Sequence, residues 1–316
     1  MNLVVVGSLN MDILIPTDPY PGPGETVMGG DIQYVPGGKG ANQAVAAARL
    51  GAHVTMLGMV GADGYGKQLK KMLEHDHVDT ELIQTSDKSS GVAFVHIEKD
   101  GENRIIVSPG ANYAYGVENV LKCKNMIERA DAVLVQLEIP IETVKAVLDI
   151  AAVAGVPTFL DPAPARADLF EQIGHVDWIV PNESEVELLT GQPVYDIKTA
   201  RLAAAKLQQL GARRVLLKVG SYGAYVSDEN GMSFQPGFQV VPVDTTAAGD
   251  AFCAAFVVDY LRYNSVHSAL RVACAAGALT VTKQGAQPSL PYAEDVTAFL
   301  DVAIEVEGLA QQSESS

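Results

Sequence analysis

The chain has 316 residues, of which 48% are hydrophobic, and its formal net charge is −16. This composition suits one large folded domain, and the absence of any basic run argues against a nucleic-acid partner. The three cysteines, Cys123, Cys253 and Cys274, have no metal-ligand spacing, so we expect buried core residues in a reducing compartment. The start reads as a strand rather than a signal peptide, and no stretch is long and apolar enough to span a membrane. We therefore expect a cytoplasmic protein without a membrane partner.

Short apolar segments alternate with helical patterns along most of the chain. The predicted strands are residues 3–6, 54–60, 132–136, 158–161, 178–180 and 215–219. The predicted helices are residues 41–50, 66–74, 141–154, 183–189, 199–210, 249–263, 265–283 and 293–302. Strands that are apolar on both faces are typical of buried parallel sheets. The alternation predicts an α/β fold with a doubly wound, mostly parallel sheet flanked by helices, in one domain over residues 1–316.

Two segments interrupt this alternation. Residues 11–36 contain proline, glycine and short alternating pieces, and residues 91–108 read as a hairpin with Asp100 and Gly101 near its turn. We expect the two segments to form a small β-sheet that acts as a lid, although they could instead be edge strands of the main sheet. The polar residues 308–316 predict a disordered tail.

The segment VPGGKGANQAVAAARLG surrounds Lys39 with glycines and leads directly into an Ala-rich helix. Glycines allow a backbone to approach a ligand closely, and a helix start favours anions. The segment fits neither a Walker A motif nor GxGxxG, which argues against a dinucleotide-dependent oxidoreductase. A glycine turn with a surface lysine is the simpler alternative. In GSLNMD, Asn10 and Asp12 project to the same face of an extended segment, which suits vicinal sugar hydroxyls or an ordinary turn.

Further polar residues follow predicted strands. Glu138 comes just after one strand, and Asn182 and Glu185 lie three residues apart at a helix start. The latter pair predicts a capping box and could also hold a hydrated Mg²⁺. Lys218 and Ser221 lie at the end of another strand, where they could reach the phosphates of a nucleotide or form a plain hairpin.

The segment VDTTAAGDAF places small residues before a predicted helix that starts near Gly249. Its exposed amides would form a nest for a transferring phosphoryl group. Asp250 would then lie in the first turn of the helix, where it could accept a proton from an attacking hydroxyl. Asp244 lies too far back for that proton and could hold a cation. An ordinary helix start is the alternative interpretation.

The segments GGKGANQAVAAARLG and DTTAAGDAF resemble the two signatures of the ribokinase, or PfkB, family of sugar and nucleoside kinases, and the resemblance extends from GSLNMD to GAQPS. It implies phosphorylation of the 5-hydroxyl of D-ribose by ATP, with Asp250 as general base and an anion hole formed by Ala247, Ala248 and Gly249. The implied sugar-binding residues are Asn10, Asp12, Gly38, Lys39, Asn42, Glu138 and Asp250. The implied nucleotide-binding residues are Asn182, Lys218, Ser221, Gly223, Gly249 and Cys274. The resemblance also implies Mg²⁺ near Glu185 through water, and a homodimer formed through the lids. The implied potassium site comprises Asp244, Thr246, Thr280, Lys283, Gly285 and Ser289.

Two positions depart from the family pattern. Lys218 occupies a position where members often have Thr, and Ala247 one where many have Gly. Other acceptors remain open, namely 2-deoxyribose, a nucleoside or a fructose-type sugar. A sugar-sensing protein that has kept the kinase scaffold without catalysis is a second alternative.

Overall fold

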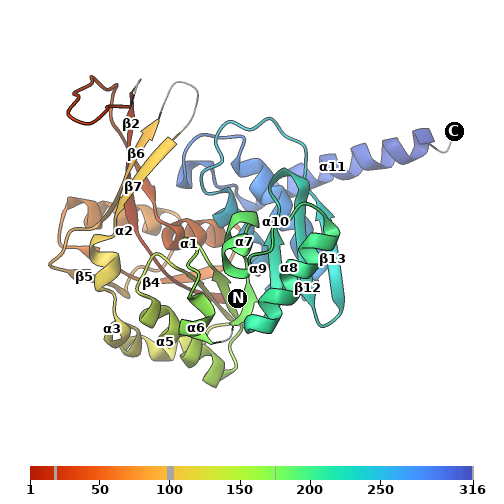
Figure 1. Cartoon of the computed structure of the whole chain (residues 1–316), viewed down its shortest axis with the longest axis horizontal. Helices are drawn as coiled ribbons and strands as arrows, with labels where there is room; N and C mark the ends of the chain where they lie inside the picture. The colour runs from red at the N-terminus through yellow and green to blue at the C-terminus, as the bar shows by residue number, and fades with distance from the viewer. Residues whose placement is uncertain (18–19, 98–102, 175, 315–316) are drawn as a thin grey trace.

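The computed structural model describes residues 1–17, 20–97, 103–174 and 176–314. They form a nine-stranded sheet and a separate four-stranded sheet (Figure 1). The nine strands lie in the order β13-β12-β11-β10-β9-β8-β1-β4-β5, and all neighbours pair in parallel except that β12 pairs antiparallel with both β11 and β13. Their bounds are β1 Asn2–Val6, β4 His53–Gly61, β5 Ile83–Ser86, β8 Ala132–Gln136, β9 Thr158–Asp161, β10 Val176–Ile179, β11 Ala212–Lys218, β12 Gly223–Asp228 and β13 Gly231–Pro236. The predicted mostly parallel sheet is confirmed.

Helices cover both faces of the large sheet (Figure 1). The α-helices are α1 Lys39–Arg49, α2 Gly64–His75, α3 Val117–Lys122, α4 Lys124–Glu128, α5 Ile141–Ala154, α6 Leu169–Ile173, α7 Glu183–Thr190, α8 Ile197–Leu210, α9 Ala248–Tyr263, α10 Val266–Thr280 and α11 Ala293–Glu314. Three short 3₁₀ helices are η1 Gly110–Ala114, η2 Gly220–Tyr222 and η3 Gln287–Ser289. Within β1, Leu3 and Val5 belong to the same buried cluster as residues of helices α1, α9 and α10, whereas Val4 and Val6 belong to the cluster that contains residues of α5, α7 and α8. This alternation explains why both faces of the strand are apolar.

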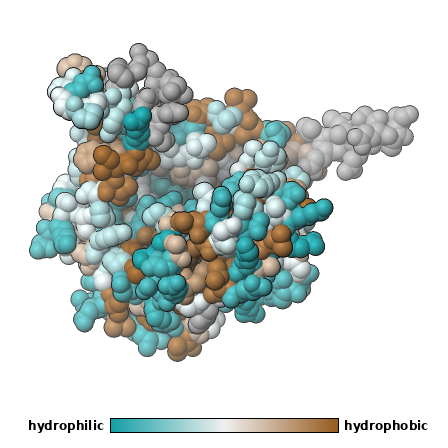
Figure 2. Space-filling model, in the orientation of Figure 1, coloured by the Kyte–Doolittle hydropathy of each residue, from teal (hydrophilic) through white to brown (hydrophobic). Residues whose placement is uncertain are grey.

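The small sheet contains the two segments that interrupt the alternation. Its strands are β2 Asn10–Pro16, β3 Gln33–Gly37, β6 Gly91–Ile97 and β7 Asn103–Ser108, in the order β3-β2-β6-β7. Strands β6 and β7 pair as the predicted hairpin, but Asp100 and Gly101 lie outside the described residues. The separate sheet is thus confirmed, and Figure 2 shows an apolar patch over it.

The end of the chain differs from the expectation. Helix α11 continues to Glu314 instead of ending near residue 302 (Figure 1). The segment LAQQSE has no proline and consists largely of residues with good helix propensity, which allows the helix to continue. No helix among the described residues is long and apolar enough to cross a membrane. All three cysteines are buried and free, as expected.

Candidate active site

The turn before helix α9 is built around Ala247. This residue has φ 61° in the left-handed region, which a side chain makes unfavourable and which occurs preferentially at functional sites. Its carbonyl accepts the amide of Ala251 at 2.9 Å, and this bond closes the first turn of the helix. The left-handed residue therefore ends the loop abruptly and brings Asp250 into the first turn.

Asp250 is almost completely buried, with 5% of its surface exposed. Its two carboxylate oxygens accept hydrogen bonds from helix α1, at 2.9 Å from Asn42 Nδ2 and 3.1 Å from Gln43 Nε2. The pKa of Asp250 is raised to about 6, because burial and the nearby Asp161 raise it by more than Lys39 and these hydrogen bonds lower it. The result is a fixed carboxylate with a pKa close to neutrality, which suits a general base.

A cavity of about 700 Å³ lies between the small sheet and the start of helix α9. It is lined by all seven predicted sugar-binding residues, namely Asn10, Asp12, Gly38, Lys39, Asn42, Glu138 and Asp250. Side chains of β2, β6 and β7 also line it, so one face of the small sheet covers the cavity. The expectation that Asn10 and Asp12 share one face agrees with their common position in this lining.

The polar groups of this cavity are held in defined orientations. Asn112 Nδ2 donates to Asn10 Oδ1 at 2.8 Å, and Glu138 accepts the amide of Lys39 at 3.1 Å. The buried Asn42 Oδ1 has no hydrogen-bond partner among the described residues. It is therefore an acceptor that a sugar hydroxyl could satisfy.

The charges in the cavity influence one another strongly. Burial raises the pKa of Asp12 to about 7, with Glu138 and Asp250 contributing. Burial alone would lower the pKa of Lys39, but Asp250, Asp161 and Glu138 raise it above its ordinary value. Lys39 is thus a permanently charged ammonium among carboxylates.

A second cavity, of about 390 Å³, lies on the other side of the same turn. Five predicted nucleotide-binding residues line it, namely Lys218, Ser221, Gly223, Gly249 and Cys274. Pro242 and Thr245 line both cavities, so the two cavities meet at the loop that leads into α9. A phosphoryl group passing between them would meet the start of this helix and Asp250.

Asn182 and Glu185 form the capping box that their spacing predicts. The amide of Glu185 donates to Asn182 Oδ1 at 2.8 Å, and the amide of Asn182 donates to Glu185 Oε2 at 2.8 Å. Neither residue is in the lining of the two cavities. Burial raises the pKa of Glu185, and Lys218 opposes this rise.

The predicted potassium site centres on Asp244. Its carboxylate accepts the amide of Thr246 at 2.9 Å and the amide of Gly285 at 2.8 Å. Burial opposes charge here, but these hydrogen bonds outweigh it and lower the pKa of Asp244. The backbone amide of Asp244 donates to the carbonyl of Val281 at 3.2 Å. This bond holds the end of α10 and the loop after it beside Asp244. The hydroxyls of Thr280 and Ser289 are buried and donate to carbonyls of their own segments. An ionised carboxylate beside loop carbonyls offers the oxygen ligands that a hard cation prefers.

Comparison with known proteins shows the family to which the chain belongs. The model of the pfkB family carbohydrate kinases matches residues 1–293. The chain belongs to this family. A ribokinase from Haemophilus influenzae is 40% identical over 302 residues, which cover 95% of this chain and 99% of the relative. A deoxyribokinase from Salmonella typhi is 33% identical over 304 residues, which cover 96% and 99%.

A solved structure gives the same result. Arabidopsis thaliana ribokinase complexed with ribose and ATP matches with a TM-score of 0.88 and 34% identity, covering 94% of this chain and 98% of that chain. As a member of the pfkB family, the protein is a phosphotransferase that acts on a sugar hydroxyl. Chain and relatives agree over nearly their full lengths, so both sheets and both cavities lie within the shared region.

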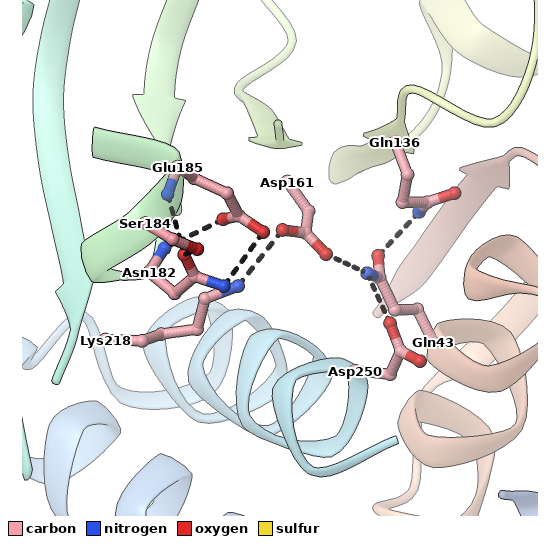
Figure 3. A network of polar contacts seen from close by, with 8 residues as sticks. All are labelled: Gln43, Gln136, Asp161, Asn182, Ser184, Glu185, Lys218 and Asp250. Carbon is pink, nitrogen blue, oxygen red and sulfur yellow. Dashed lines mark hydrogen bonds and ion pairs between the residues drawn. The ribbon is translucent and has the colours of Figure 1, made fainter. Parts of the chain in front are cut away.

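The structure also reveals polar residues of this pfkB family site that the sequence did not single out. Asp161 ends strand β9 and lies between Lys218 and Gln43, and Gln43 lies between Asp161 and Asp250 (Figure 3). One signal was present, because a carboxylate that ends a parallel strand falls at the edge where ligands bind. Gln43 gave no such signal, because a single glutamine in an Ala-rich helix has no spacing that indicates a functional role.

Proposed function

We propose that the protein transfers the γ-phosphoryl group of ATP to the 5-hydroxyl of D-ribose. The observation that carries this proposal is the meeting of two cavities at the loop that leads into α9, with Asp250 buried in the first turn of that helix. One cavity is rich in carboxylates and amides that suit hydroxyl groups, and the other contains Lys218 and glycines that suit a nucleotide. The resemblance to ribokinases supports ribose as the acceptor.

The roles of the site residues follow from this arrangement. Asp250 accepts the proton of the attacking hydroxyl, and amides of Ala247, Ala248 and Gly249 stabilise the negative charge of the transferring group. Asn10, Asp12, Glu138 and Asn42 orient the sugar, with Gly38 and Lys39 beside them. Holding acceptor and donor in line is the larger part of phosphoryl transfer, because the transition state needs positioning and charge stabilisation.

The metal ions belong to the same proposal. Among the described residues, no group of three or more His, Cys, Asp or Glu side chains could hold a metal ion. Mg²⁺ would be held mainly by the phosphates of the nucleotide and by water, as is usual for this ion. Glu185 would hold its water shell, and the bound ion would neutralise charge on the triphosphate. Asn182 would support the same region from the capping box. Asp244 and Ser289, with the carbonyls of Thr246, Thr280, Lys283 and Gly285, would hold potassium.

Potassium should therefore activate the enzyme. We expect higher kcat/KM in potassium than in sodium at equal ionic strength, because the ion would fix the loop that leads into α9. Asp244→Asn should remove most of this difference, since it weakens the ionic ligand. Steady-state assays in the two salts measure the effect, and equal rates in both would disprove the site.

The pH dependence should report the base. Asp250 must be unprotonated to accept a proton, and its pKa is raised from 3.8 to about 6, so kcat/KM should fall as the pH drops through about 6. Asp12 has a pKa of about 7 and therefore titrates in the same pH range. The profile should therefore also be measured in Asp12→Asn, which should keep the limb near pH 6. An acid limb near pH 4 in both proteins would contradict this role for Asp250.

A coupled assay of ADP release tests the function directly. ATP, Mg²⁺ and K⁺ would be offered with D-ribose, 2-deoxyribose, fructose and adenosine. We expect the highest kcat/KM for ribose, because a site that hydrogen-bonds the 2-hydroxyl leaves polar groups unpaired with deoxyribose. A preference for 2-deoxyribose would favour the activity named for the Salmonella relative, and sugar binding without ADP release would favour a sensor.

The proposal also covers the cellular compartment and the oligomeric state of the enzyme. Three buried free cysteines suit a reducing cytoplasm. The exposed side chains of Tyr34, Phe94 and Ile106 on the small sheet suit a homodimer formed through the lids. Sedimentation of the purified protein as a monomer at micromolar concentration would disprove the dimer.

A further inference from the structure

Asp161 is the centre of a buried polar network beside the reaction centre (Figure 3). It is 3% exposed, and its two carboxylate oxygens have different partners. Lys218 Nζ donates to Oδ1 at 3.0 Å, and Gln43 Nε2 donates to Oδ2 at 3.0 Å. The carboxylate thus connects strand β11, which borders the nucleotide cavity, with helix α1, which borders the sugar cavity.

Gln43 carries this connection on to Asp250. Its Nε2 group also donates to Asp250 Oδ1 at 3.1 Å, so its two hydrogens bind two different carboxylates. Gln136 Nε2 donates to Gln43 Oε1 at 2.5 Å, which fixes the direction of the Gln43 amide. Asn42 holds the other oxygen of Asp250, so Asp161 contributes to the orientation of Asp250 through the fully buried amide of Gln43.

Lys218 lies at the phosphate end of the network. A Cβ atom placed on Gly249 would be 3.7 Å from Lys218 Nζ, so the ammonium lies against the first turn of α9. A cation is unfavourable at a helix N-terminus, where the exposed amides already create positive potential. Asp161 stabilises the cation in this position, and a phosphoryl group bound at the start of α9 would also stabilise it.

The network also balances charge around the base. Without a nearby cation, the buried Asp161 would repel the Asp250 carboxylate and disfavour its ionised form. Lys218 compensates the charge of Asp161 on one side, and Lys39 opposes the same repulsion within the sugar cavity. The remaining carboxylates that face this region are Asp12, Glu138 and Glu185.

We propose that Asp161 is a positioning residue that couples the two ends of phosphoryl transfer in this chain. It holds the Lys218 ammonium against the transferring phosphoryl group and, through Gln43, orients Asp250 toward the attacking hydroxyl. Lys218 and Asp161 then act in part as one unit, because the ammonium loses its support without Asp161, whereas the contact of Asp161 with Gln43 does not need Lys218. This inference rests on the proposed function, because it assigns one cavity to the acceptor and the other to the triphosphate.

A double-mutant cycle tests this unit. Asp161→Asn and Lys218→Met are nearly isosteric, and each should lower kcat by at least about tenfold, with about 100-fold for loss of the cation. The KM for the sugar should change by less than about twofold, because neither residue lines the sugar cavity. The protein with both substitutions should be slower than Lys218→Met, because the path through Gln43 is also lost, but clearly faster than the product of the two single losses predicts, whereas independent residues would give losses that multiply.

The control is another buried ion pair of the same chain. Arg49 Nε lies 2.7 Å from Asp76 Oδ1, the side chains are 11% and 7% exposed, and neither residue lines either cavity. Asp76→Asn should lower thermal stability without lowering kcat. Should Lys218→Met fail to fold, Lys218→Gln keeps a polar head and replaces it in the cycle.

The outcomes separate this inference from the proposed function. The cycle uses the best acceptor of the sugar panel, so a preference for another sugar would refute ribose and leave the cycle intact. Multiplicative losses in the double variant would overturn the coupling. Wild-type kcat in Asp161→Asn would overturn the positioning role, as would a loss confined to the KM for the sugar.

Discussion

Replacement of Asp250 by Asn is expected to lower kcat by about 10²–10⁴-fold, the range typical of general-base catalysis. The side chain would keep its shape and its place in the first turn of α9, but it could no longer accept a proton. The KM for ribose should change little, because Asn10, Asp12 and Glu138 would still bind the sugar. Steady-state kinetics of ADP release, with ribose binding measured separately by calorimetry, would give the two quantities.

A second carboxylate on the same helix provides the control. Asp259 is also buried, at 7% exposure, and burial raises its pKa, yet it lies outside both cavities. Asp259→Asn should therefore leave kcat unchanged. A similar loss of kcat in both variants would show that Asp250 acts through the stability of the helix. A nearly unchanged kcat in Asp250→Asn would refute the role of Asp250 as general base.

The main features of the fold and site could be predicted because each depends on a local pattern. Alternation of apolar strands and helices predicts the layered sheet, and the parallel strands bring their carboxyl ends to one edge. VDTTAAGD and GGKGANQ then fall at helix starts on this edge. The resemblance to the family assigned Asn10, Asp12 and Glu138 to one site, although the distances between them could not be known.

The remainder of the site depends on contacts between distant segments. Asp161 is 57 residues from Lys218 and 118 residues from Gln43 in the chain, and no local spacing indicates their pairing. The orientation of Asn10 depends on Asn112 in η1, 102 residues away. Such partners become visible only once the register of the strands is fixed.

The glycines near Lys39 are required for packing within the protein as well as for ligand binding. Their sequence suggests backbone that approaches a ligand, and Gly38 does line the sugar cavity with φ 89°. Gly37 and Gly40, however, approach the protein itself. A Cβ on Gly37 would lie 2.2 Å from an oxygen of Asp12, and one on Gly40 would lie 2.6 Å from the backbone of Gly7 and Ser8. Small residues are thus required here for packing as well as for binding.

Replacement of Gly40 by Ala is therefore expected to impair both folding and catalysis. The new methyl group would meet backbone atoms, which cannot rotate away, and overpacking of this kind costs about 1–3 kcal/mol or more. Helix α1 would have to shift, and Lys39, Asn42 and Gln43 would move with it. A displacement of about 1 Å can reduce the rate about 100-fold, so we expect a lower melting temperature together with a large loss of kcat/KM.

Gly64 provides the matched control for this substitution. It lies in the first turn of helix α2, and a Cβ there would have no neighbour within 4 Å. Gly64→Ala should leave activity unchanged and stability unchanged or slightly higher, because alanine favours the helix. Thermal unfolding and ribose kinetics of both variants decide the matter. Gly40→Ala could instead have the melting temperature and the kcat/KM of the wild type. In that case the close approach of α1 to the Gly7–Ser8 backbone does not position Asn42 and Gln43 around Asp250. Their placement would then depend on the remaining contacts between α1 and α9.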